Sequence, residues 1–126
     1  MEVRKIGVIG AGQMGHGIAL VSAKAGFNVI LRDIKEEYVK KGISKIERFL
    51  DKSIEKGRMT AEEKKKILSR IKGTTKLEDF KDVDLVIEAI FENVKVIIVF
   101  TKSIPVNWQK PINSLCYPII INRRFE

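Results

Sequence analysis

Three glycines near the start of the chain have the spacing that binding of a dinucleotide requires. They form the pattern G-x-G-x-x-G at Gly10, Gly12 and Gly15, between an apolar run and an amphipathic segment. The first glycine permits a tight turn, the second lets the backbone approach a pyrophosphate, and the third lets a helix pack closely on a sheet. The pyrophosphate would lie on the free N–H groups at the start of that helix. The predicted cofactor-binding loop consists of Gly10, Ala11, Gly12, Gln13, Met14 and Gly15.

An acidic residue follows the loop at the distance that ribose recognition needs. Asp33 comes eighteen residues after Gly15, at the end of a second β-rich run. Its carboxylate would accept hydrogen bonds from the adenosine ribose hydroxyls and repel a 2′-phosphate, which favours NAD over NADP. The adjacent Arg32 keeps NADP open, because arginine accommodates a phosphate. A plain helix N-cap is the other interpretation of Asp33.

The elements around these residues predict a βαβ unit. Residues 6–9 form a short apolar strand, a helix spans 13–25, and residues 28–32 form a second strand. Gly26 lies where a helix C-cap belongs. Apolar residues of the helix recur at spacings of three and four, which predicts that its buried face carries Met14, Ile18, Val21 and Ala25.

The rest of the legible sequence predicts a helical hairpin and further strands. A long amphipathic helix covers 36–56 and stops at Gly57, and Thr60 and Glu63 match a capping box for a second helix. Residues 71–75 fit a short strand, and the continuous apolar run 84–90 is typical of a central parallel strand. The predicted fold class is α/β, a Rossmann-type doubly wound parallel sheet with a helical hairpin insertion after the second strand.

Composition narrows the function classes. The 126 residues suit one domain, and 44% apolar with 32% charged residues is ordinary for a soluble protein. No apolar stretch reaches membrane-spanning length and no signal peptide is evident, so we expect a cytoplasmic protein without membrane contact. The net charge of +8 suits polyanionic partners. Lysines alternate with glutamates through residues 35–66, which favours solvated helix faces, so we expect no nucleic-acid partner.

Other residues that could do chemistry receive no catalytic or metal role. His16 falls in the first turn of the predicted phosphate-binding helix, away from any carbonyl to be reduced, and is expected to be structural. One cysteine, Cys116, and one histidine make neither an internal disulfide nor a metal cluster. Asp79, Asp82 and Asp84 fit loops and strand ends better than a metal site.

Several segments together resemble the N-terminal domain of the 3-hydroxyacyl-CoA dehydrogenase family, which includes 3-hydroxybutyryl-CoA dehydrogenases. The similarity runs from about Lys5 to Val96. The long lysine-rich helix contributes to it, and the other matching segments are 6–15, 17–20, 55–58, 84–90 and 92–95. The combination of a helical hairpin with the strand end Val-Ile-Glu-Ala makes the resemblance far more specific than the glycine motif alone.

The resemblance implies NAD as cofactor and an acyl-CoA as the substrate of the full-length enzymes. Gly10 to Gly15 would hold the pyrophosphate and Asp33 the adenosine ribose. The nicotinamide half would lie beside Ala89, Ile90 and Glu92. Lys56 matches a lysine that contacts the coenzyme A part of the substrate, although a solvated helix lysine is an equal alternative.

After Val96 the sequence departs from the family, so the resemblance implies an incomplete NAD-binding Rossmann domain at 1–96 and a divergent tail of uncertain structure at 97–126. Ile97 replaces a lysine, and the Ser-Asn-Thr-Ser segment, the catalytic histidine and glutamate pair and the α-helical C-terminal domain do not follow. Codons for residues 116–125, read one base later, are compatible with the family's continuation, so we hypothesise a frameshift after Val96.

These features predict the NAD-binding part of an oxidoreductase that interconverts (3S)-3-hydroxyacyl-CoA and 3-ketoacyl-CoA, truncated and weakly active or inactive alone. The alternative is a regulatory or stand-alone NAD-binding module that pairs with a separate catalytic subunit. Formation of a homo-oligomer is left open as a prediction, because the family's dimer contacts lie largely in its α-helical C-terminal domain.

Overall fold

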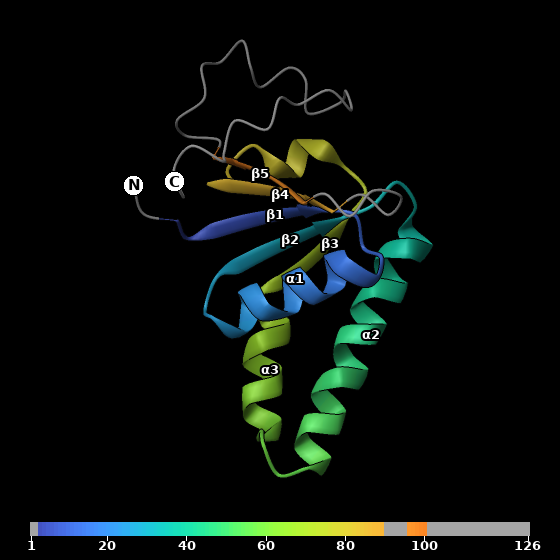
Figure 1. Ribbon diagram of the computed structural model, residues 1–126, viewed down its shortest axis with the longest axis vertical. Coiled ribbons are helices and arrows are strands. Elements are labelled where there is room, and N and C mark those ends of the chain that lie inside the picture. The colour runs from blue at the N-terminus through green and yellow to red at the C-terminus, as the bar shows by residue number, and fades with distance from the viewer. Residues whose placement is uncertain (1–2, 90–95, 101–126) are drawn as a thin grey trace.

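The computed structural model describes residues 3–89 and 96–100 (Figure 1). Strands and helices alternate along this part of the chain, as the sequence pattern predicts for an α/β protein. In chain order the elements are β1 (Lys5–Ile9), α1 (Gln13–Lys24), β2 (Asn28–Arg32), α2 (Glu36–Glu55), α3 (Ala61–Ser69), β3 (Ile71–Thr74), the 3₁₀ helix η1 (Leu77–Phe80), β4 (Leu85–Ala89) and β5 (Val96–Phe100).

The strands form a single sheet in the order β3-β2-β1-β4-β5. The first four are parallel, with Val8 opposite Leu31 of β2 on one side and Ile87 of β4 on the other. From β1 the chain builds outward through β2 to β3 and then returns to the opposite side of β1 to form β4. This reversal confirms the predicted Rossmann-type sheet and creates a switch point between β1 and β4 at the carboxyl ends of the strands. β5 runs antiparallel to β4, in a segment for which the sequence analysis made no structural prediction.

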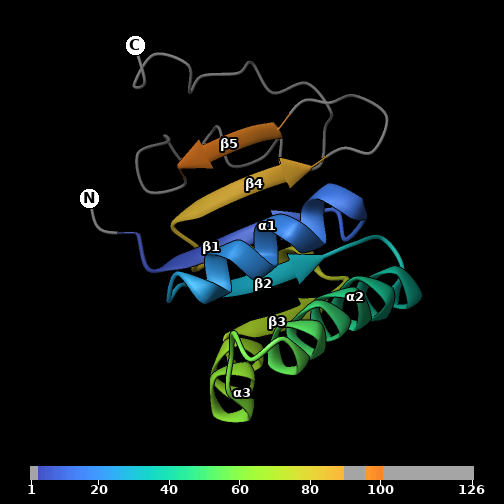
Figure 2. The same cartoon turned by 60° about the horizontal axis from the view of Figure 1, so that its bottom comes forward.

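Helices α1, α2 and α3 cover one face of the sheet, as Figure 2 shows. Between them and the sheet lies the larger core, which includes Val8, Leu31, Ile46 and Leu50, all fully buried. The opposite face is packed by η1 and the loop after it, through a smaller cluster of Ile30, Phe80, Val83 and Val86. β2 therefore contributes to both cores, which explains its continuous apolar run.

The predicted buried face of α1 is wrong except at Ile18, which is partly buried against the larger core. Val21 is 66% exposed and Met14 is 38% exposed, while the buried residues are Gly15, Ala19, Leu20 and Ala23. Three of these four are small, and they share a face at spacings of four. Small side chains allow α1 to lie close to the sheet, so close approach rather than side-chain size selects the buried face.

The predicted helical hairpin is confirmed. Val39, Ile46 and Leu50 of α2 are buried on one face, and Gly57 ends the helix with a φ of 71°. Thr60 begins α3, because its hydroxyl oxygen accepts a hydrogen bond from the Glu63 amide at 3.2 Å. This is the first of the two hydrogen bonds of the predicted capping box, the one that the Thr60 side chain accepts. In the described part of the chain, no helix combines the length and apolar character needed to cross a bilayer.

Two of the three aspartates that precede β4 accept hydrogen bonds within the fold, and the third, Asp82, is exposed. Asp84 is buried, and one of its carboxylate oxygens accepts hydrogen bonds from the backbone amides of Arg4 and Lys5 at 2.9 and 3.1 Å. It thereby joins the start of β4 to the start of β1. Asp79 accepts a hydrogen bond from the Thr74 hydroxyl, which lowers the pKa of its carboxyl group. Residues 3–89 and 96–100 contain no group of three or more side chains arranged to hold a metal ion.

Candidate functional site

A cleft of about 970 Å³ opens at the carboxyl ends of β1, β2 and β4. This is the switch point of the sheet, where open α/β sheets bind their ligands. The cleft brings together all six residues of the predicted loop, Asp33 and Ala89. Its walls are formed by Ile9, Gly10, Ala11, Gly12, Gln13, Met14, Gly15, Arg32, Asp33, Ile34, Tyr38, Lys41, Lys45, Glu88 and Ala89.

The glycine loop is shaped by backbone contacts that exclude any side chain. Gly10 has a φ of 102°, and a Cβ atom built on it would lie 2.4 Å from the carbonyl oxygen of Ala89. A Cβ atom on Gly15 would lie 1.6 Å from the carbonyl oxygen of Gly10. Gly12 is the N-cap residue of α1, and no described side chain caps it. The first amides of α1 therefore face the cleft as donors for an anion such as a pyrophosphate.

Asp33 lies directly beside this loop. One carboxylate oxygen accepts a hydrogen bond from the Ala11 amide at 2.9 Å, and the other accepts from the Ile34 amide at 2.7 Å. The alternative that Asp33 only caps the next helix is wrong, because Lys35 is the N-cap residue of α2. An ionised carboxylate has about four acceptor positions, so it can accept ribose hydroxyls in addition to the two amides.

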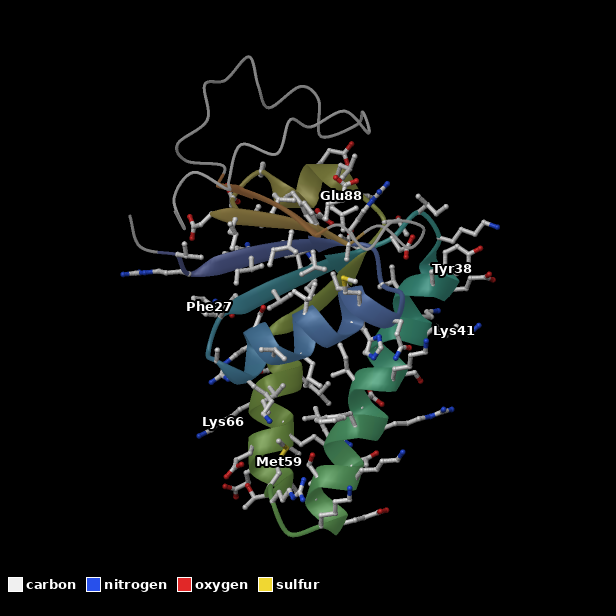
Figure 3. The ribbon with its side chains drawn as sticks, viewed as in Figure 1. Phe27, Tyr38, Lys41, Met59, Lys66 and Glu88 are labelled. Carbon is white, nitrogen blue, oxygen red and sulfur yellow. The ribbon has the colours of Figure 1, made fainter. Side chains whose placement is uncertain are left out.

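The first half of α2 supplies a wall of the cleft that the sequence analysis missed. Tyr38, Lys41 and Lys45 follow one another at spacings of three and four, which places them on one side of the helix. Figure 3 shows Tyr38 and Lys41 on the N-terminal part of α2, with Met59 at the far end of the hairpin. The spacing was visible in the sequence, but only the apolar face of this helix was analysed. The two lysines place positive charge beside the anion-binding end of α1.

Glu88 is a second cleft residue that the sequence analysis missed. It pairs with Ile9 across the β1–β4 register, so it lies at the switch point itself. Partial burial raises the pKa of its carboxyl group. Ala89, which was predicted, follows it on the cleft wall. The other two residues predicted near the nicotinamide, Ile90 and Glu92, lie outside the described residues.

Two further residues from the sequence analysis do not line the cleft. His16 places its ring Nδ1 2.8 Å from the carbonyl oxygen of Gly12, a contact within the first turn of α1. Lys56 is exposed at the C-cap of α2. It is fifteen residues beyond Lys41, which along an α-helix is a distance of about 22 Å. Neither residue is part of the cleft wall.

Comparison with known proteins places this architecture in a family. Residues 5–104 match the family model described as 3-hydroxyacyl-CoA dehydrogenase, NAD binding domain. The chain belongs to this family. The cofactor of the domain is therefore NAD, in agreement with a cradle of glycines and an acidic residue at the end of β2. The match extends beyond the domain boundary that the sequence analysis predicts at Val96.

Individual relatives agree with the family assignment. A probable 3-hydroxybutyryl-CoA dehydrogenase from Deinococcus radiodurans is 53% identical over 89 residues, which are 71% of this chain and 32% of the relative. The 3-hydroxybutyryl-CoA dehydrogenase of Bradyrhizobium diazoefficiens is 48% identical over 94 residues, 75% of this chain and 32% of the relative. The crystal structure of (S)-3-hydroxybutyryl-CoA dehydrogenase PaaH1 from Ralstonia eutropha superposes with a TM-score of 0.71 at 43% identity, covering 73% of this chain and 32% of that one. The chain spans about a third of the length of these relatives.

Proposed function

We propose that this domain is the NAD-binding part of an oxidoreductase that interconverts (3S)-3-hydroxyacyl-CoA and 3-ketoacyl-CoA. The observation that carries the proposal is the cleft at the switch point, where the loop of residues 10–15 meets Asp33. Family membership and the names of the relatives support the substrate class. The cleft residues would hold NAD, which would supply the hydride acceptor for oxidation and the hydride donor for reduction.

Within this proposal each part of the cleft has a separate binding task. The amides at the N-terminus of α1 would bind the pyrophosphate, and Asp33 would bind the adenosine ribose hydroxyls. Ala89 at the end of β4 would lie beside the nicotinamide half, together with Ile90 and Glu92. Lys56 would contact the coenzyme A part of the substrate. Its exposed position at the turn of the hairpin leaves its ammonium group accessible to a large anionic molecule.

We further propose that the 126-residue chain binds NAD and turns over acyl-CoA substrates weakly or not at all by itself. Oxidation of a hydroxyl requires a base that takes its proton. The chain has one histidine, His16, and its ring contacts the Gly12 carbonyl at the pyrophosphate end of the cleft. Missing acid-base catalysis alone lowers a rate by roughly 10²- to 10⁴-fold.

The proposal is tested by calorimetry and by a chimera. The purified chain, its mass verified, should bind NAD and produce no NADH from (3S)-hydroxybutyryl-CoA beyond the background. In the chimera, residues 5–89 replace the corresponding segment of the Ralstonia eutropha enzyme and should support NADH production from the same substrate. A chimera that folds and binds NAD without turnover would contradict the proposed reaction. Rapid turnover by the 126-residue chain would contradict the proposed dependence on further residues.

A further inference from the structure

We propose that Asp33 is also the positioning residue of the glycine loop, so that its carboxylate holds the loop in the binding conformation before a dinucleotide arrives. Only the expected effect of this positioning on cofactor binding rests on the proposed placement of the cofactor in the cleft. The positioning itself is a property of the protein without ligand. It adds a task to Asp33 that ribose recognition does not require.

The hydrogen bonds around the loop carry this inference. Asp33 accepts the Ala11 amide at 2.9 Å through one oxygen and the Ile34 amide at 2.7 Å through the other. The amide of the preceding loop residue, Gly10, donates to the Arg32 carbonyl at 2.7 Å. The last residue of β2 and the residue after it therefore bind two successive amides of the loop. A carboxylate forms stronger hydrogen bonds with amides than a neutral acceptor does.

Packing prevents the loop from finding another arrangement at low cost. Ala11 is 4% exposed. Gly42 of α2 lies against it, so closely that a Cβ atom on Gly42 would be 2.8 Å from the Ala11 carbonyl oxygen and 3.0 Å from the Ala11 Cβ atom. Water therefore has little access to the Ala11 amide, and a buried amide without an acceptor is unfavourable. Loss of the Asp33 carboxylate leaves this amide without its partner.

The hydrogen-bonding capacity of Asp33 also differs from that of asparagine, its isosteric replacement. Each carboxylate oxygen faces an amide donor, and both oxygens keep further lone pairs for ribose hydroxyls. In Asp33→Asn the side-chain NH₂ group would face one of the two amide donors, whichever way the amide is turned. Asparagine can therefore satisfy only one of the two amides. The positioning role thus predicts that Asp33→Asn disturbs the loop nearly as much as Asp33→Ala.

The first test needs no cofactor. Hydrogen exchange of the Ala11 amide, followed by NMR in the protein without ligand, should become at least about tenfold faster in Asp33→Ala and in Asp33→Asn. The amide of Leu50 in the core should exchange as in the wild type, which shows that the fold is intact, and Asp82→Ala serves as a control for loss of a carboxylate. Ala11 exchange that is unchanged in both Asp33 variants would overturn the positioning role.

The second test separates positioning from ribose contact. Binding of NAD and of its analogue with 2′,3′-dideoxyadenosine is measured by calorimetry for wild type and Asp33→Ala. A residue that only contacts the ribose hydroxyls would leave the analogue's affinity unchanged, whereas positioning predicts about a fivefold weaker binding of the analogue by the variant. Equal binding of the analogue by both proteins would overturn the proposal. A wild type that binds neither dinucleotide would contradict the proposed cofactor site, and Ala11 exchange would then decide the positioning role alone.

Discussion

The two ends of α2 show how one helix serves two different regions. Its N-terminal half packs Gly42 against the glycine loop and presents Tyr38, Lys41 and Lys45 to the cleft. Its C-terminal half packs Ile46 and Leu50 into the larger core and ends, beside α3, at the exposed Lys56. At the cleft end, a Cβ atom built on Gly10, Gly15 or Gly42 would lie less than 3 Å from a backbone carbonyl oxygen, so these positions leave no room for a methyl group.

At the hairpin end, an ion pair on the surface joins α2 and α3. Lys64 forms an ion pair with Asp51 at 2.5 Å, and the Asp51 side chain is 55% exposed. Exposed pairs of this kind contribute little to stability, typically less than about 1 kcal/mol. From this difference we expect sensitivity to substitution to follow close backbone approach, as at Gly15, rather than the density of charged residues.

The strongest test of this comparison is a methyl group placed in the loop. Gly15→Ala should weaken NAD binding on the order of 100-fold and lower the melting temperature, because the new Cβ atom would overlap the Gly10 carbonyl and displace the loop or the helix. Calorimetry and thermal unfolding measure the two effects.

Gly17→Ala is the matched control on the same helix. A Cβ atom on Gly17 has no neighbour within 4 Å. Alanine in place of a helical glycine should raise stability by about 0.5–1 kcal/mol and leave NAD binding unchanged. If both alanine variants bind NAD equally well, close approach at Gly15 does not determine the site.

The next effect concerns the choice of cofactor. The wild type should bind NADH more tightly than NADPH, because a 2′-phosphate would approach the Asp33 carboxylate in a partly desolvated cleft. Asp33→Ala should weaken NADH binding about tenfold, because a hydrogen bond to a charged group is lost. The variant should also narrow the ratio of the dissociation constants of NADPH and NADH. Fluorescence titration with both reduced cofactors measures the ratio. An unchanged ratio would refute the assigned contact with the ribose.

A smaller effect on NAD affinity should distinguish the lysines at the cleft end of α2 from Lys56 at the hairpin end. The double variant Lys41→Ala/Lys45→Ala should weaken NAD binding by a few-fold, and the loss should shrink at high salt, because screened charges act over less than about 10 Å at 0.1 M ionic strength. Lys56→Ala should leave NAD binding unchanged and raise the KM for acyl-CoA in the chimera. Equal losses of NAD affinity in both variants would show that overall charge, rather than the cleft wall, attracts the cofactor.

The smallest effect is expected from Glu88. Burial raises the pKa of its carboxyl group in the folded state, so the folded protein binds the proton more tightly than the unfolded chain. Stability from this group is therefore greatest below the ordinary carboxyl pKa and falls as pH rises through the raised value.

Glu88→Gln removes this pH-dependent loss. It should raise the melting temperature by a few degrees at most at pH 7, with no gain near pH 4. Glu47→Gln, at an exposed position of α2, serves as the control. A gain that is equal at both pH values would contradict the assigned titration.

Much of this protein follows from local rules that the sequence displays. The strand-glycine-helix start, the helix ends at Gly26 and Gly57, and the cap at Thr60 depend on residues a few positions apart. Because φ preferences and caps act locally, their prediction is confirmed. The spacing of the glycines and Asp33 predicted the cofactor for a similar reason, since the βαβ unit has a nearly constant length.

Other features required the packed structure, because they join segments that are distant in the chain. The buried face of α1 is set by how closely its small residues let it approach the sheet. The spacing of apolar residues does not predict this distance. The cleft wall at Lys41, Lys45 and Glu88 depends on where α2 and β4 lie relative to β1. The bond from Asp33 to Ala11 spans 22 positions and forms only when β2 pairs with β1. The sequence by itself thus determined the helices, the four parallel strands and the class of ligand, and tertiary packing decided which side chains surround that ligand and what holds its loop in place.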